Sequence, residues 1–178
     1  MRKVILQMTI SIDGVANVGG GPEDPELQAI KRDLLSHAGC HIMGRTTYEE
    51  MRQFWPYSDH AYAAPMNDLP KVVFSRTLTE APWEASRIAG GDLAQEIDAL
   101  KREPGGDILA WGGASFAQAL IAANLIDEYR LVVNPVIAGE GSSIFRPFAG
   151  PVDVTLTRAE AFASGAVLHV YENPHRRA

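Results

Sequence analysis

Three times along this 178-residue chain, a short apolar run ends in a small or basic polar turn, and a helix is expected directly after it. The three segments are residues 41–49, 72–77 and 108–115. Apolar runs of four or five residues bounded by turns are typical of buried strands, and strands that alternate with helices form parallel sheets. Because neighbouring parallel strands end at one edge of a sheet, the three turns are expected to lie together there.

The residues in these turns suit the binding of phosphate groups. Helix N-terminal amides are unpaired and carry partial positive charge, glycine lets the backbone come close, and arginine adds a fixed charge with several donors. A phosphorylated dinucleotide is the natural ligand for three such turns, so the sequence predicts a reductase that uses NADP(H). The predicted cofactor-binding residues of the turns are Gly44, Arg45, Thr46, Thr47, Ser75, Arg76, Gly112, Gly113, Ala114 and Ser115.

Composition narrows the class of protein. The apolar content of 46% and the charged content of 21% are ordinary for a globular chain, and residues 1–178 are expected to form a single domain. A formal net charge of −6 argues against a nucleic-acid partner, since such surfaces are usually basic. Cys40 is the one cysteine, so no intrachain disulfide is possible, and an inert core thiol is expected.

Targeting and metal signals are missing from the sequence. No signal-peptide core follows Met1, and no apolar stretch approaches the ~18 residues of a membrane span, so a cytoplasmic protein without a membrane partner is expected. The five histidines do not cluster, and no set of metal ligands is recognisable. No metal is therefore expected.

The pattern of elements predicts an α/β fold with three α/β/α layers. Strand and helix alternate over the first two-thirds, and the last third adds antiparallel strands with a hairpin at Ser164-Gly165. Gly39 is expected to cap the first helix. The result is an eight-stranded mixed, mostly parallel sheet with helices on both faces. Strands are predicted at residues 3–10, 40–43, 71–74, 86–88, 107–111, 128–136, 152–161 and 166–171, and helices at 25–38, 46–54, 92–101 and 114–123.

Several short motifs in a fixed order resemble the dihydrofolate reductase fold. The closest likeness is to its riboflavin-biosynthesis branch, the reductases similar to the RibD C-terminal domain. The motifs are Ser11-Ile12-Asp13-Gly14 and residues 43–49, 74–77, 111–116, 127–129, 134–136 and 139–141. The resemblance covers residues 3–172. It implies hydride transfer from NADPH to a flat nitrogen heterocycle, as in a 5-amino-6-(5-phosphoribosylamino)uracil reductase. A dihydrofolate reductase, or a nucleotide-binding protein of this fold without turnover, stays open as an alternative.

The resemblance also implies residue roles. Arg45, Thr46 and Thr47 would contact the phosphates of NADP, and Ser75 and Arg76 would hold the 2′-phosphate. The glycine pair Gly112-Gly113 would approach the pyrophosphate or the nicotinamide. Gly113 would then tolerate no side chain, because a Cβ would clash or block the required backbone dihedral. Thr9 would meet the nicotinamide carboxamide, and residues 12–21 would form a mobile flap.

The proton donor is less well defined. Dihydrofolate reductases carry a carboxylate on the first helix, which here makes Glu26 or Asp33 a candidate, and Asp13 is a third; at most one would serve. The alternative for Glu26 and Asp33 is that they are solvated charges on a helix. The alternative for Asp13 is that it forms a turn. Riboflavin-type reductases commonly have lysine where this chain has Gln7, and glutamate where it has Trp111. Trp111 would stack on a flat heterocycle or fill the core.

The last third of the chain predicts a homodimer, as in the riboflavin-type relatives. One sheet face is unlikely to cover all of its apolar residues, and a large exposed apolar patch usually marks an interface. The alternative is that helices of the first two-thirds cover them. The apolar residues are those of 128–137, Ile144, Phe145, Phe148 and 152–156.

Overall fold

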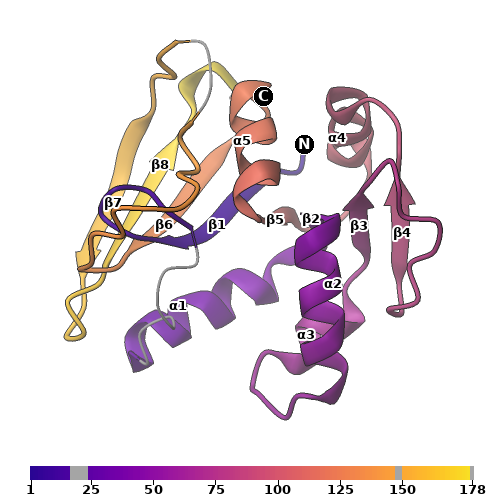
Figure 1. The fold of residues 1–178 in the computed structure, drawn as a ribbon, viewed down its shortest axis with the longest axis horizontal. Helices are drawn as coiled ribbons and strands as arrows, with labels where there is room; N and C mark the ends of the chain where they lie inside the picture. The colour runs from indigo at the N-terminus through magenta and orange to yellow at the C-terminus, as the bar shows by residue number, and fades with distance from the viewer. Residues whose placement is uncertain (17–23, 147–149, 177–178) are drawn as a thin grey trace.

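The computed structural model describes residues 1–16, 24–146 and 150–176, in which eight strands form one sheet (Figure 1). Their order is β4-β3-β2-β5-β1-β6-β8-β7. All neighbours from β4 to β6 are parallel, whereas β8 is antiparallel to β6 and β7. The predicted mixed, mostly parallel sheet is confirmed. The strands are β1 (Val4–Ile10), β2 (Ala38–Gly44), β3 (Lys71–Phe74), β4 (Ser86–Ala89), β5 (Asp107–Trp111), β6 (Glu128–Val133), β7 (Thr155–Ala161) and β8 (Val167–Glu172).

Helices cover both faces of the sheet, which confirms the three-layer α/β/α arrangement. Figure 1 shows α4 and α5 on one face and α1, α2 and α3 on the other. A short 3-10 helix, Trp55–Tyr57, continues from α2, and another, Pro174–Arg176, follows β8. The helices are α1 (Pro25–Ser36), α2 (Arg45–Phe54), α3 (Ala63–Asp68), α4 (Leu93–Arg102) and α5 (Ala114–Ala122). No helix among the described residues is long and apolar enough to span a membrane.

The predicted cap at Gly39 is wrong. Helix α1 ends at Ser36, His37 is its C-cap, and Gly39 lies inside β2. A Cβ at Gly39 would lie 2.6 Å from the main-chain oxygen of Gly106. Glycine is therefore needed there because the segment leading into β5 passes close to the backbone of β2.

Side chains of β1 alternate between the two faces of the sheet. Val4, Leu6, Met8 and Ile10 enter the core beneath α4 and α5. Ile5 packs on the opposite face, with residues of α1 and α3. The same alternation places Gln7 and Thr9 on the α1 face, toward the carboxyl end of the strand.

An ion pair is buried at the amino end of β1. Lys101 Nζ lies 2.7 and 2.8 Å from the two carboxylate oxygens of Asp127, and their side chains are 5% and 8% exposed. Asp127 Oδ2 also accepts the amide of Val4 at 2.7 Å. The pair thus joins α4 to the central strand of the sheet.

Lys101→Met is expected to lower the free energy of unfolding by about 3–5 kcal/mol, because it removes one partner of a buried ion pair. Arg102→Met removes the same charge from the exposed neighbouring position and is expected to cost less than about 0.5 kcal/mol. Urea denaturation followed by circular dichroism measures both. Equal, small losses for the two variants would contradict this account of the ion pair.

Candidate functional site

The three turns singled out in the sequence meet at one edge of the sheet. Met43 pairs with Trp111, and Gly44 pairs with Phe74, so β2 lies between β5 and β3 and the three strands end side by side. Helix α2 begins directly after β2, and α5 follows β5 with two residues between them. The helix expected after the second turn is wrong, because the chain goes from β3 directly to β4. The N-cap residues of α2 and α5, Gly44 and Gly113, make no side-chain cap hydrogen bond. The first amides of both helices are therefore left for another acceptor.

The three glycines at this edge have different surroundings. A Cβ at Gly112 would lie 3.0 Å from Met8 Sδ, and one at Gly44 would lie 3.2 Å from Phe116 Cβ, so both positions serve packing. At Gly113 a Cβ would meet only Thr47 Oγ1, at 3.1 Å. Its φ of −78° suits any residue, so the expected dihedral requirement at Gly113 is wrong. A side chain there would press on the hydroxyl of the buried Thr47, so a packing cost is expected even without a ligand.

The polar side chains of the turns differ in the hydrogen bonds and ion pairs that they already form within the protein. Arg45 forms an ion pair with Glu49 at 3.4 Å, one helical turn away. Ser75 Oγ accepts the amides of Thr77 and Leu78 at 3.2 and 2.9 Å, which leaves its hydroxyl proton for another acceptor. Arg76 is exposed and forms no ion pair within the described part of the chain. Exposed as well are Thr46 and Ser115, whereas Ala114 is half-buried.

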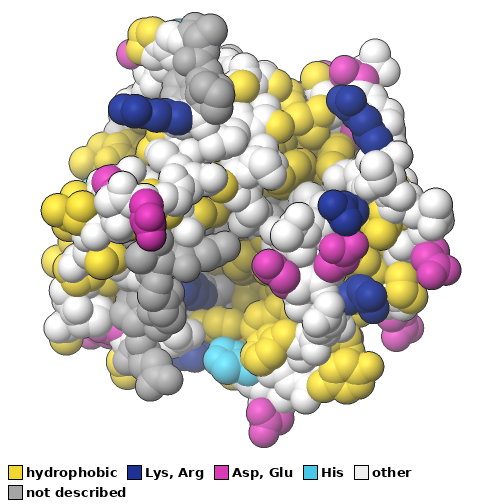
Figure 2. Space-filling model, in the orientation of Figure 1, with side chains coloured by type: hydrophobic (Ala, Val, Ile, Leu, Met, Phe, Trp, Pro, Cys, Tyr) yellow, Lys and Arg dark blue, Asp and Glu magenta, His cyan; other side chains and the backbone are white. Residues whose placement is uncertain are grey.

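A pocket of about 710 Å³ adjoins this edge on the α1 face of the sheet. Gln7 and Thr9 of β1 and Trp111 of β5 lie in its lining, with residues of α1, α2 and the segment up to α3. Figure 2 shows this side of the molecule hollowed, with apolar side chains in the hollow. Thr9, Thr47 and Gly112 also line the pocket, so three of the predicted cofactor residues connect it to the helix termini.

Aromatic rings form one side of the pocket. Phe54 and Trp55 meet edge to face with centroids 4.9 Å apart, Trp55 and His60 at 6.0 Å, and His60 and Tyr62 at 4.6 Å. All four line the pocket, as does Trp111. Aromatic walls favour a flat ring, which stacks or packs against their faces and edges.

Trp111 is held in place by a buried histidine. Its indole Nε1 donates to His41 Nδ1 at 2.8 Å, and His41 Nε2 lies 3.1 Å from the main-chain oxygen of Pro65. This geometry needs a neutral ring with its proton on Nε2. Burial lowers the pKa of His41 to about 4, so the neutral form is the one present near pH 7.

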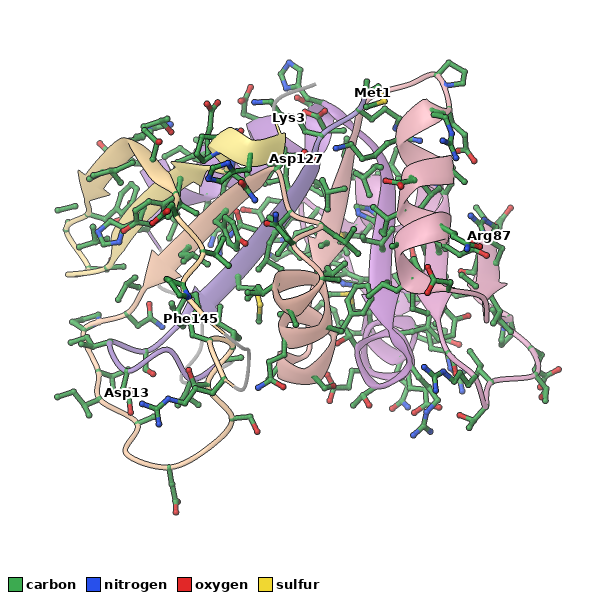
Figure 3. The ribbon with its side chains drawn as sticks, turned by 90° about the horizontal axis from the view of Figure 1, so that it is seen from above. Met1, Lys3, Asp13, Arg87, Asp127 and Phe145 are labelled. Carbon is green, nitrogen blue, oxygen red and sulfur yellow. The ribbon has the colours of Figure 1, made fainter. Side chains whose placement is uncertain are left out.

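The three candidate proton donors lie away from the pocket. Glu26 and Asp33 are exposed on α1, and neither lines the pocket. Asp13 accepts from the Ser11 hydroxyl at 2.6 Å and from the amides of Ala138 and Gly139 at 2.9 Å. These bonds lower the pKa of Asp13 to about 2, so it acts as an ionised clamp between two loops. Figure 3 shows Asp13 at the end of the sheet opposite to Lys3 and Asp127.

The residues that do face the pocket from α1 were not predicted. They are Gln28, Lys31 and Leu35, whose spacing of three and four places them on one face of the helix. Glu50 of α2 lines the pocket as well. Helical periodicity shows that Gln28, Lys31 and Leu35 share one face of α1. Only the packing of α1 in the structure shows that this face lines a pocket and does not point into solvent.

Two further expectations concern the surroundings of the site. Residues 17–21 of the expected flap lie outside the described residues, so its mobility stays a prediction. Among the residues that the structure describes, no three His, Cys, Asp or Glu side chains gather as metal ligands would.

His41 is expected to make stability depend on pH. The unfolded chain binds a proton on this residue near its ordinary pKa of 6.5, whereas the folded protein resists protonation down to about pH 4. Unfolding thus takes up a proton in this window, and the free energy of unfolding falls by roughly 3 kcal/mol as the pH drops through it. Urea denaturation across this pH range should show a slope that His41→Gln reduces; an unchanged slope would contradict a buried neutral His41.

Comparison with known proteins shows relatives in sequence and in fold. YyaP, an uncharacterized Bacillus subtilis protein, is 29% identical over 96% of this chain and 94% of its own length. A protein assigned to riboflavin biosynthesis from Shewanella sp. PV-4 has a TM-score of 0.76 at 20% identity, over 96% of this chain and 98% of that chain. A pyrimidine reductase-like protein from Corynebacterium diphtheriae has a TM-score of 0.67 at 15% identity, over 96% and 91%.

The chain also matches a model of a protein family. The model describes the RibD C-terminal domain and matches residues 2–168, which include all three turns and every residue of the pocket named above. The match confirms the resemblance drawn from the motifs. The chain belongs to the RibD C-terminal domain family.

Proposed function

We propose that this protein is an NADPH-dependent reductase that transfers a hydride to a flat nitrogen heterocycle. The observation that carries the proposal is the position of Thr9, Thr47 and Gly112. These residues line the aromatic pocket, and Thr47 and Gly112 also lie at the two uncapped helix termini. A dinucleotide bound across the termini would therefore end where a flat ring enters the pocket.

The residues at the sheet edge fit such a cofactor. The first amides of α2 and α5 would hold its phosphates, with Arg45 beside them, and the lack of a side chain at Gly113 would let a pyrophosphate approach the backbone. Ser75 and Arg76 would hold the 2′-phosphate that distinguishes NADP from NAD. When bound, the nicotinamide supplies the hydride, and this chain orients the two rings and excludes water around them.

The pocket favours a substrate other than a pterin. A pterin presents an edge of N–H donors, which a carboxylate on the first helix recognises in dihydrofolate reductases. The pocket-facing residues of α1 in the described part are Gln28, Lys31 and Leu35, and none is a carboxylate. This favours a reductase similar to 5-amino-6-(5-phosphoribosylamino)uracil reductase over the dihydrofolate reductase alternative. Following the absorbance of NADPH with pterins, pyrimidines and quinones tests turnover, and its absence with every one would favour a nucleotide-binding protein.

Arg76→Ala is expected to weaken NADPH binding about tenfold or more and to leave NADH binding nearly unchanged, because an arginine–phosphate contact contributes about 1.5–3 kcal/mol. The matched control is Arg87→Ala on β4, which removes an arginine paired with Glu96. Fluorescence titration of both nucleotides measures the affinities. Equal affinities of the parent protein for NADPH and NADH would rule out the assignment of Arg76.

The last third of the chain supports a homodimer. Ile137 and Leu156 are exposed, and so are Phe145 and Val154, which line an apolar cavity of about 530 Å³ together with residues of β6 and β8. Ile144 and most of β6 are buried within the chain, so they do not contribute to this surface. Phe148, part of the same expectation, lies outside the described residues. A second copy of the chain would bury these side chains about a two-fold axis. Light scattering at micromolar concentration should give about twice the chain mass of 19.3 kDa, and the single-chain mass would refute the dimer.

A further inference from the structure

Gln7 places an amide without a protein partner on the floor of the pocket. The residue belongs to β1, lines the pocket and is 6% exposed. Within residues 1–16, 24–146 and 150–176, its side-chain amide makes no hydrogen bond to the protein. Buried polar groups nearly always have a partner, because a buried group without one is costly. The partner of this amide has to come from the cavity.

The neighbours of Gln7 on the sheet are engaged elsewhere. Arg130 is its register partner on β6 and forms an ion pair with Glu128 at 2.5 Å. Trp111 is its register partner on β5, and the indole N–H of Trp111 donates to His41 at 2.8 Å. Trp111 therefore offers the pocket the apolar surface of its ring, whereas Gln7 offers it a free polar group.

Gln7 and Trp111 together suit a ring with one polar edge. They lie side by side on β1 and β5, and both line the pocket. A flat ring that packs on the indole would bring an edge to the amide. A carboxamide has an acceptor oxygen beside an NH₂ donor, so it forms two parallel hydrogen bonds with an edge that carries an N–H next to a C=O. Such an edge belongs to a lactam, a cyclic amide.

We propose that Gln7 is a specificity-determining residue that recognises a neutral lactam edge on a flat heterocycle packed against Trp111. The inference rests on the proposed function, because it concerns which rings the same pocket accepts. A ring whose nitrogen carries a substituent in place of hydrogen loses the donor and leaves the amide oxygen of Gln7 unpaired. Sites built around such a bond discriminate strongly against the analogue that lacks it.

A matched pair of flat, neutral probes tests the proposal. Lumichrome has lactam edges, and its derivative methylated at both ring N–H nitrogens has none. Fluorescence titration of the parent protein should show that lumichrome binds about ten- to a hundredfold more tightly than the methylated probe. Gln7→Met keeps the length of the side chain and removes its donor and acceptor. In this variant lumichrome should bind more weakly, and the two affinities should agree within about threefold.

Further variants separate hydrogen bonding from shape. Gln53→Met makes the same change at an exposed residue of α2, outside the pocket lining, and should keep the full preference. Gln7→Glu keeps the shape of the side chain but replaces the NH₂ donor with a second acceptor, so it should lose the preference as well.

Three outcomes would overturn the role of Gln7. They are equal binding of both probes by the parent protein, no binding of lumichrome, and an undiminished preference in Gln7→Met, which would show that the pocket excludes the methyl groups by shape. NADPH is titrated separately. A parent protein that does not bind NADPH would remove the proposed reductase function, whereas the comparison of the two probes would stand by itself.

Discussion

The buried ion pair between Lys101 and Asp127 fixes the strand on which the rest of the structure depends. The Asp127 carboxylate accepts from the Val4 amide at 2.7 Å, the Asp127 amide donates to the Val4 oxygen at 3.0 Å, and the Asn173 amide donates to the Asp127 oxygen at 2.9 Å. The side chain and the main chain of one residue, Asp127, thus set β1 against β6, α4 and the segment after β8. A buried charge pair tolerates few arrangements, because each group needs its partner and its hydrogen bonds at once.

The register of β1 carries this constraint to the pocket. Its even-numbered residues fill the core under α4 and α5, whereas Gln7 and Thr9 reach the pocket on the other face. A shift of one residue would exchange the two sets and turn the polar side chains of Gln7 and Thr9 toward the core. Interactions at the amino end of the strand therefore decide which groups a ligand meets at its carboxyl end, several residues away.

The sheet and the turns could be predicted from the sequence because they depend on local patterns. Short apolar runs between turn residues marked the buried strands β1, β2, β3 and β5, and the glycine and arginine turns marked the edge where β2, β3 and β5 end. Which side chains of α1 line the pocket could not be predicted in the same way. Leu27 and Leu34 showed which stripe is buried, but the adjacent stripe with Gln28 and Lys31 is distinguished from the one with Asp33 only by how α2 and α3 pack. Gly39 was misread for a related reason, since its need for glycine comes from a distant backbone.

The two halves of the site differ in what builds them. The edge at α2 and α5 consists of backbone amides and glycines, whose positions follow from the fold itself, and relatives as distant as 15–29% in identity share that fold or sequence pattern. The opposite wall consists of side chains on α1. His41 keeps the floor between them constant, because a neutral imidazole holds the Trp111 indole from within β2. The sheet edge is thus set by the fold, whereas the wall that faces it is set by individual side chains at positions 28, 31 and 35.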